Sequence, residues 1–572
     1  LMNFRQLGSL TPGHPEYGHT VGVEATTGPL GAGMGMAVGM AIAEKHLASV
    51  FNKENYPVVD HYTFVLGGDG CMMEGISSEA FSLAGTLGLD KLIVLYDSNQ
   101  ISIEGSTDIA FRENVQERMK AFGFQTITVE DGNNISAIGM AIEAAKAETE
   151  RPSFITIKTQ IGYGCPAKQG KASAHGEPLG EENVKALREN LGWPYEEPFF
   201  VPQEVYEHYS RLAEEKAEAE AAWNVMFAAY CGEYPEMEAL WDQYHSAPAK
   251  EELLNDASLW MPNEKAEATR SLSGKMINLL KDKLPNLIGG SADLAPSNKT
   301  AMKDAGDFSA EDPSGRNLHF GVRELAMAAI GNGIMLHGGL RAYVATFFVF
   351  SDYVKPMARL SALMGMPLTY VLTHDSIGVG EDGPTHEPIE QLAMLRAMPN
   401  FHVFRPCDAT ETSAAWLAAV TSEKTPTALV LSRQNLNPIP GSSREALKGG
   451  YVIDDCEGTP EAILIASGSE VDLAVKAKAE LAAEGMKVRV VSMPCMDVFE
   501  EQSDEYKESV LPKAVRKRVA IEALSGFGWG KYVGLDGGYV TMNGFGASGP
   551  AGKLFEKFGF TVENVVKTVK AL

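Results

Sequence analysis

The sequence predicts three consecutive α/β domains with mostly parallel sheets. Apolar strand-like segments alternate with amphipathic or alanine-rich helical segments along most of the 572 residues. This alternation is typical of βαβ units, which build parallel sheets covered by helices. The length suits about three domains that each bury a core of their own. We place them at residues 1–235, 263–441 and 442–572, with a connector at 236–262.

The first domain shows the pattern most clearly. HYTFVLGGDG (61–70) predicts a buried strand that runs into a glycine turn, and KLIVLYDSN (91–99) predicts the next strand. EGISSEAFSLAGTLGLD (74–90) between them predicts a helix. A second helix near 135–148 and a strand at SFITIKT (153–159) extend the series. Strands joined by helices in this way form a parallel sheet.

The later domains repeat this alternation after a charged segment. The first part of 203–285 is alanine-rich with helical spacing, which predicts an exposed helix followed by the connector. Strands are predicted at NLIGGSADL, RAYVATFFVF, MPLTYVLTHD and TALVLSRQN. SSREALKGG (442–450) is interpreted as a linker, and further strands are predicted at AILIASGS, KVRVVSMP and KRVAIEA.

Charge and cysteine usage exclude several classes of protein. The formal net charge of −26 repels nucleic acid and anionic lipid, so neither nucleic acid nor a membrane is an expected partner. A few local arginines still permit a phosphorylated substrate. The six cysteines are far apart, which argues against a disulfide framework and for the cytoplasm. The chain begins without methionine or a signal peptide, and we expect it to be an internal fragment.

Two strand ends in the first domain predict a metal site. Asp69 lies in a Gly-Asp-Gly turn after one strand, and Asn99 ends the next. Both turns belong to one βαβ unit and therefore meet at the carboxyl edge of the sheet, where ligands bind. A carboxylate, an amide oxygen and the backbone carbonyl of Ile101 suit a hard divalent cation that also binds phosphate oxygens. The alternative is a pair of ordinary βα turns.

Residues 26–47 form a glycine-rich segment that enters a predicted helix of small residues. Backbone N–H groups at such a helix start bind phosphate groups well. The glycines do not fit a dinucleotide-binding fingerprint, because Val38 stands where the last glycine belongs. Close helix packing explains Gly33, Gly35 and Gly39 equally well.

The second domain adds a carboxylate, an aromatic run and a polar loop. Glu324 is at a predicted helix start, where its alternative role is to suit the helix dipole. The run around Phe347, Phe350 and Tyr353 predicts either a slot for a heteroaromatic ring or a core strand. THDSIGVGEDGPTHEP (373–388) is dense in ionisable residues, as functional loops are. Arg433 suits phosphate capture or, alternatively, a surface ion pair.

In this order, the motifs resemble the transketolase family. The matching strings include TPGHPE, GVEATTGPLG, GDGCMMEGISSEA, GGSADLAPSN, HFGVREL, THDSIGVGEDGPTHEP, LSRQNL and FGASGP. They cover essentially the whole chain. The resemblance implies a domain that binds the diphosphate, a domain that binds the pyrimidine, and a C-terminal domain. It also implies a homodimer with thiamine diphosphate and Mg²⁺ or Ca²⁺, which transfers two-carbon ketol units between sugar phosphates in the pentose phosphate pathway.

The resemblance also assigns roles to individual residues. Asp69, Asn99 and the Ile101 carbonyl match the metal ligands. The remaining cofactor-binding matches are Leu30, Gly70, Glu74, Asp293, Phe347, Phe350 and Tyr353, with Glu79 linking the two active sites alongside Glu74. Glu324, His14, His175 and His386 match catalytic residues. The substrate-binding matches are His14, His175, Arg270, Ser297, His374, Asp382, His386 and Arg433.

Two other functions stay open from the sequence. A related thiamine enzyme, such as dihydroxyacetone synthase or deoxyxylulose-phosphate synthase, has the same cofactor chemistry. An inactive, truncated binding paralogue keeps the fold without the reaction. The resemblance places two upstream histidine motifs, of the SGHPG and SNGHGS kind, in an N-terminal stretch of about 80–90 residues. Neither string occurs here.

Overall fold

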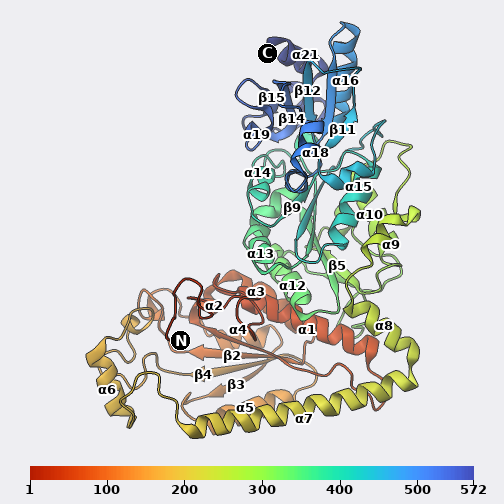
Figure 1. Cartoon of the computed structure of the whole chain (residues 1–572). Helices are drawn as coiled ribbons and strands as arrows, with labels where there is room; N and C mark the ends of the chain where they lie inside the picture. Colours follow the sequence, from red (N-terminus) through yellow and green to blue (C-terminus); the bar gives the residue numbers. More distant parts are fainter. The chain divides into compact units, whose positions relative to one another are not determined.

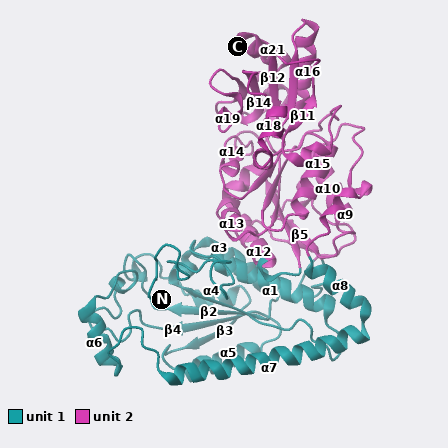
Figure 2. Ribbon diagram, in the orientation of Figure 1, with its two compact units in different colours: residues 1–246, 308–315, 336–339 teal, residues 247–307, 316–335, 340–572 magenta.

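The computed structural model describes residues 1–572. It divides them into two compact units, drawn in different colours in Figure 2. Unit 1 comprises residues 1–246, 308–315 and 336–339, and unit 2 comprises the remaining residues. Unit 1 holds one sheet and unit 2 holds two, all three mostly or wholly parallel. The prediction of α/β domains with mostly parallel sheets is confirmed.

The sheet of unit 1 has the strand order β1-β2-β4-β3, and all its strand pairs are parallel. Strands β1 (Thr63–Gly68), β2 (Leu92–Ser98) and β4 (Ser153–Lys158) confirm the three predicted strands. Strand β3 (Gln125–Val129) was not predicted. It has only five residues, two of them threonine, and most are half-buried, so no continuous apolar run marks it.

Helices cover both faces of this sheet (Figure 1). Helix α5 (Ile135–Lys146) packs on one face, against a core that includes Ile93, Val129 and Ile155. Helix α1 (Ala32–Phe51) lies on the opposite face beside α3 (Gly75–Thr86) and is buried over most of its length, which its glycines and alanines permit. The other α-helices of unit 1 are α2 (Asp69–Met73), α4 (Val115–Ala121), α6 (Glu181–Leu191), α7 (Gln203–Glu233) and α8 (Pro235–His245).

The first sheet of unit 2 is wholly parallel, in the order β6-β5-β7-β8-β10-β9. Every residue of its central strands β8 and β10 is buried, as expected for a sheet covered on both faces. Helices α10 (Thr269–Leu280) and α15 (Ala409–Val420) pack on one face. The strands are β5 (Leu287–Ser291), β6 (Asn317–His319), β7 (Arg341–Phe347), β8 (Thr369–Thr373), β9 (His402–Phe404) and β10 (Thr427–Leu431).

The remaining helices of this part of unit 2 are short or lie beside the sheet. They are α9 (Lys250–Asn255), α11 (Ala295–Asn298), α12 (Glu324–His337), α13 (Ser351–Met364) and α14 (Gln391–Arg396). Helix α12 starts in unit 2 and its last two residues fall in unit 1. Helix α12 begins at Glu324, as predicted. No helix of the chain has the length and hydropathy that crossing a membrane requires.

The second sheet of unit 2 has the order β11-β13-β12-β14-β15, and only the β11–β13 pair is antiparallel. Helices α16 and α21 bury the apolar core on one face, while α17, α18 and α19 cover the other. The strands are β11 (Tyr451–Asp454), β12 (Ala462–Ala466), β13 (Val488–Ser492), β14 (Lys517–Ser525) and β15 (Gly538–Met542). The helices are α16 (Glu470–Ala483), α17 (Met496–Glu500), α18 (Asp504–Val510), α19 (Gly530–Val533), α20 (Ala551–Lys557) and α21 (Val562–Ala571).

A buried arginine links the two sheets of unit 2. Arg405 follows β9, is fully buried, and donates to Asp375 at 2.9 Å and to Glu470 of α16 at 2.5 Å. Burial alone lowers the pKa of Arg405, but the charges of Glu470, Asp375 and Glu522 raise it above its ordinary value. The guanidinium therefore stays charged between carboxylates from both parts of unit 2.

We expect Arg405→Ala to lower the free energy of unfolding by about 3–5 kcal/mol, because it leaves buried carboxylates without their counter-charge. Urea unfolding followed by tryptophan fluorescence measures this loss. Arg516→Ala is the matched control, since its ion pair with Asp536 is mostly exposed and is worth at most about 1 kcal/mol. Equal losses in the two variants would contradict a central role for Arg405.

Candidate active site

The two predicted metal-binding turns of unit 1 lie side by side. Strands β1 and β2 pair in register up to Gly68 and Asp97, so both turns leave the same edge of the sheet. The buried Asp69 carboxylate accepts hydrogen bonds from the Tyr96 hydroxyl at 2.5 Å and from the Gln100 backbone N–H at 2.9 Å. The aspartate is thus tied directly to the turn that carries Asn99 and Ile101.

The donor chemistry of this turn pair fits a hard divalent cation. Asp69 supplies a carboxylate whose oxygens each accept one bond and keep a further lone pair. Asn99 accepts from the Ile101 N–H at 3.0 Å, which fixes the orientation of its amide oxygen. Nowhere in the chain do three His, Cys, Asp or Glu side chains gather as a metal centre, so amide and carbonyl oxygens would have to complete a set of ligands here. A cation bound at these turns takes oxygen ligands, as Mg²⁺ and Ca²⁺ prefer.

The glycine-rich loop before α1 packs against the turn that carries Asp69 and Gly70. A Cβ atom on Gly70 would lie 2.9 Å from Leu30 Cδ1, so these two predicted cofactor residues are in contact. Gly31 has φ +79°, and a Cβ there would come within 2.5 Å of Ile76. Only glycine allows this approach. The Leu30 side chain and Glu74 remain exposed beside the Asp69 turn.

The predicted histidines of unit 1 make no polar contact with the other predicted site residues. His14 and His175 both lie exposed in loops, His175 directly after a short 3₁₀ helix at Ala172–Ala174. No hydrogen bond or ion pair joins either imidazole to another predicted site residue. Their roles stay predictions.

In unit 2, the predicted aromatic residues form a stepped series of rings. Phe347 ends β7, and its ring lies parallel to that of Phe350, with centroids 6.1 Å apart. Tyr353, at the start of α13, lies 6.1 Å from Phe350 and is largely exposed. Glu324 is half-buried at the start of α12. Asp293 is exposed just beyond the end of β5 and adopts φ +62°, an uncommon backbone conformation for a non-glycine residue.

A positively charged cluster surrounds His374. Burial lowers the pKa of His374, and together with the charges of Arg270 and Arg433 it brings that pKa to about 3. Burial also lowers the pKa of Arg270, as does the neighbouring Arg433. Arg270 donates to the Ser297 carbonyl at 2.7 Å, while its buried Nε has no partner. Two repelling arginines and an unpartnered donor are the features that a bound anion would satisfy.

A hydrogen-bond chain that the sequence did not reveal fixes the His374 ring. Thr373 donates its hydroxyl proton to Asn298 at 2.7 Å and therefore accepts from His374 Nδ1 at 2.8 Å. The neutral ring thus carries its proton on Nδ1 and presents Nε2 as an acceptor. Phe347 packs against the same ring at an interplanar angle of 33°, with centroids 3.8 Å apart. Asn298 lies in the GGSADLAPSN motif, but only the fold places it beside Thr373.

The rest of the polar loop extends this cluster. His386 packs edge-on against Phe350, with ring centroids 5.7 Å apart. Like the two arginines, it lowers the pKa of His374 through its charge. Asp382 is exposed in the same loop. The structure therefore gathers most of the predicted residues of unit 2 into one connected group: Arg270, Ser297, Phe347, Phe350, Tyr353, His374, His386 and Arg433.

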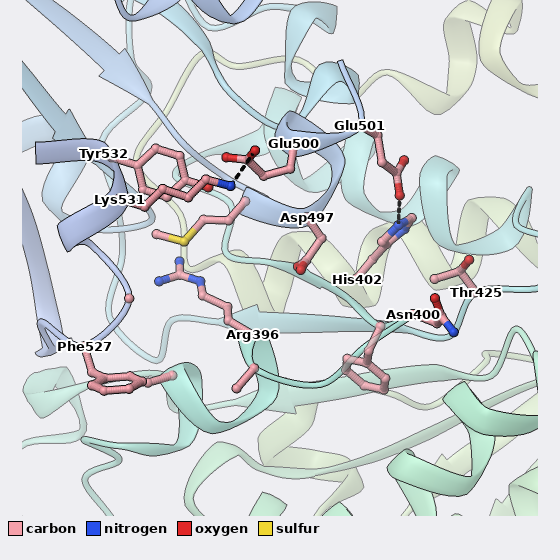
Figure 3. Close-up of a pocket in the computed structure, with 15 residues that line it drawn as sticks. Arg396, Asn400, His402, Thr425, Asp497, Glu500, Glu501, Phe527, Lys531 and Tyr532 are labelled. Atoms are coloured by element: carbon pink, nitrogen blue, oxygen red, sulfur yellow. Dashed lines mark hydrogen bonds and ion pairs between the residues drawn. The ribbon is translucent and has the colours of Figure 1, made fainter. Parts of the chain in front are cut away.

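A separate cavity of about 470 Å³ lies elsewhere in unit 2 (Figure 3). Helix α14, the residues from it to His402 of β9, and Thr425 line it together with residues in and next to α17 and α19, and none of them is a predicted site residue. Two of its carboxylates already have partners, since Glu500 pairs with Lys531 at 2.6 Å and Glu501 with His402 at 3.0 Å. The cavity is therefore distinct from the cluster around His374.

Comparison with known proteins identifies relatives along the whole chain. Residues 1–248 match the family model described as the transketolase thiamine diphosphate binding domain. Residues 265–438 match the transketolase pyrimidine binding domain, and residues 449–561 match the transketolase-like C-terminal domain. The chain is 56% identical to a transketolase of Bacillus subtilis (strain 168), covering all of this chain and 86% of that protein. It is 53% identical to the chloroplastic transketolase-1 of Arabidopsis thaliana, over 78% of that protein.

Solved structures show the same similarity. Transketolase from Leishmania mexicana superposes with a TM-score of 0.95 at 46% identity, covering all of this chain and 84% of that one. A Pichia stipitis transketolase in complex with sedoheptulose 7-phosphate also gives a TM-score of 0.95, at 44% identity and with 85% of that chain covered.

We expect the His374 imidazole to stay neutral from pH 8 down to pH 4, because its pKa is lowered to about 3. NMR titration of labelled imidazoles measures this, with His374→Asn identifying the signal. Since the unfolded chain binds this proton near pH 6.5, the contribution of His374 to stability is lost as the pH falls from 6.5 towards 3.

Inorganic phosphate should raise the pKa of His374, because an anion offsets the two arginines. Arg433→Ala should raise it without phosphate, by removing one of those charges. A wild-type His374 that titrates near pH 6.5 without phosphate would contradict this description of the cluster.

Proposed function

The chain belongs to the transketolase family, and from this premise we propose that its own residues bind thiamine diphosphate with a divalent cation and move a two-carbon ketol unit between sugar phosphates. The donor is a ketose phosphate such as xylulose 5-phosphate, and the acceptor is an aldose phosphate such as ribose 5-phosphate. The reaction belongs to the pentose phosphate pathway. The relative from Pichia stipitis, crystallised with sedoheptulose 7-phosphate, supports substrates of this class.

The positive cluster around His374 carries this proposal. Arg270 and Arg433 lie close enough to repel one another, and Arg270 Nε is buried without a partner. A sugar phosphate group satisfies both features through charge-assisted hydrogen bonds. Neutral His374 offers only an acceptor at Nε2, so it donates to a phosphate after it gains a proton. Ser297 completes the proposed phosphate site through its position beside Arg270.

The donor set of unit 1 suits the diphosphate end of the cofactor. Asp69, Asn99 and the Ile101 carbonyl would hold Mg²⁺ or Ca²⁺, while Leu30 and Gly70 contact one another next to that turn. In unit 2, Phe347, Phe350 and Tyr353 would receive the pyrimidine ring. When bound, thiamine diphosphate supplies the nucleophilic carbon and electron sink that cleavage beside a carbonyl group needs.

We assign the proton transfers of the reaction to the remaining predicted residues. Glu324 would share a proton with the cofactor's aminopyrimidine, from its half-buried position at a helix start. His386, His14 and His175 would exchange protons with sugar hydroxyls, and Asp382 would read one of those hydroxyls. Glu74, Glu79 and Asp293 complete the proposed cofactor contacts.

We further propose a homodimer in the cytoplasm. Val322 and Tyr353 are large, exposed side chains near Glu324 and the aromatic series, and a second copy would cover them. All six cysteines are free thiols, in keeping with a reducing compartment.

We expect the protein to form sedoheptulose 7-phosphate from xylulose 5-phosphate and ribose 5-phosphate. Arg433→Ala should raise KM for phosphorylated sugars about tenfold or more, since it removes about 1.5–3 kcal/mol of charge-assisted hydrogen bonding. Hydroxypyruvate, which has no phosphate, should remain a nearly unaffected donor. Arg211→Ala, on an exposed helix of unit 1, is the control. Equal loss with both kinds of donor would point away from a phosphate site.

We expect Asp69→Ala to weaken thiamine diphosphate binding in the presence of Mg²⁺, because the diphosphate loses its bridging cation. Calorimetric titration measures this directly, without turnover. Glu104→Ala removes a neighbouring exposed carboxylate and should bind the cofactor normally. An unchanged affinity in Asp69→Ala would show that this residue only shapes the turn.

A further inference from the structure

Segment 544–550 near the C-terminus covers the polar loop 380–388. Ser548 donates its hydroxyl to the Glu381 carbonyl at 2.6 Å, and the Gly549 N–H lies 3.5 Å from the Gly380 carbonyl. A Cβ atom on Gly383 would lie 3.2 Å from Ser548 Cβ. The two segments are about 160 residues apart in the sequence, yet their backbones are in close contact.

Glu387 lies beneath this contact and has no use in the proposed reaction. It directly follows His386 and is only 2% exposed. Neither carboxylate oxygen has a hydrogen-bond partner, although the N–H groups of Ala547 and Gly380 approach closely enough to influence it. Burial raises its pKa and outweighs the opposite effect of those two amides, so that the pKa is about 7. A buried carboxyl group without hydrogen-bond partners lowers the stability of the fold, so its presence here calls for a functional explanation.

The carboxyl group of Glu387 leaves no room for a side chain on the covering segment. A Cβ atom on Gly546 would lie 1.7 Å from Glu387 Oε2 and 3.3 Å from Ile377 Cγ2. A Cβ atom on Gly544, two residues earlier, would have no neighbouring atom within 4 Å. The close fit is therefore specific to Gly546 within this segment.

We propose that Glu387 and Gly546 form a clamp through which the C-terminal segment 544–550 fixes the position of loop 380–388. Glu387 is a positioning residue: it touches no substrate, and it acts through His386 and Asp382, which the same loop presents. This inference rests on the proposed function, because the two side chains matter as sugar-binding groups only if the protein handles sugars. It assigns the C-terminal domain a direct part in forming the sugar site.

The test uses size exchange at the contact. Gly546→Ala should displace the loop, speed amide hydrogen exchange in residues 380–388, and raise KM for the acceptor sugar by about ten- to a hundredfold. Calorimetric affinity for thiamine diphosphate should stay unchanged. Gly546→Ala combined with Glu387→Ala should restore both exchange and KM to within about threefold of wild type, because the smaller side chain makes room for the new methyl group. Gly544→Ala is the matched control and should behave as wild type.

Three results would overturn the clamp. One is a Gly546→Ala protein with wild-type exchange in 380–388. A second is faster exchange with an unchanged KM, which would reduce the contact to a packing feature. The third is a double variant that recovers neither property. A wild-type protein without ketol transfer would refute the proposed function instead, while the exchange measurements would still decide whether the contact holds the loop.

Discussion

The parallel pairing of β5, β7, β8 and β10 determines where almost every candidate residue of unit 2 lies. These four strands are neighbours in one sheet, and their carboxyl ends meet at one edge. Asp293 follows β5, Phe347 ends β7, His374 follows β8 and Arg433 follows β10. Segments separated by more than a hundred residues thereby form one site, as is usual at the carboxyl edge of a parallel sheet.

His374 shows how this edge sets chemistry as well as position. The residue adopts φ +67°, a conformation that non-glycine residues seldom adopt, and its ring is held by Phe347 on one side and Thr373 on the other. Burial, with the charges of two nearby arginines, keeps the ring neutral. Backbone strain and electrostatic repulsion both cost free energy. Such features are common at ligand-binding sites, where interactions with the ligand offset the cost.

The C-terminal part of unit 2 supports this edge through two different contacts. Arg405 ties Asp375, the residue after His374, to Glu470 of α16 with buried charge. Segment 544–550 covers the other end of the same loop. The loop that carries His374, Asp382 and His386 is therefore tied to the last domain in two places, through Arg405 to Glu470 and directly to segment 544–550. The last domain contributes none of the predicted site residues itself.

The sequence by itself determined the α/β class, most strands, the adjacent turns that carry Asp69 and Asn99, and the helix start at Glu324. These depend on local patterns, such as apolar runs and turn residues, that a single segment contains. Strands β3 and β15 were not predicted, because each has only five residues and neither contains a continuous apolar run.

Only the tertiary structure decided which side chains meet. The proton position on His374 depends on Asn298, and the fit of Gly546 depends on Glu387 from a distant segment. Likewise, the charge of Arg405 persists because three carboxylates from different elements surround it. Burial and hydrogen bonding between remote segments arise from the packing of the whole domain, and no local pattern encodes them.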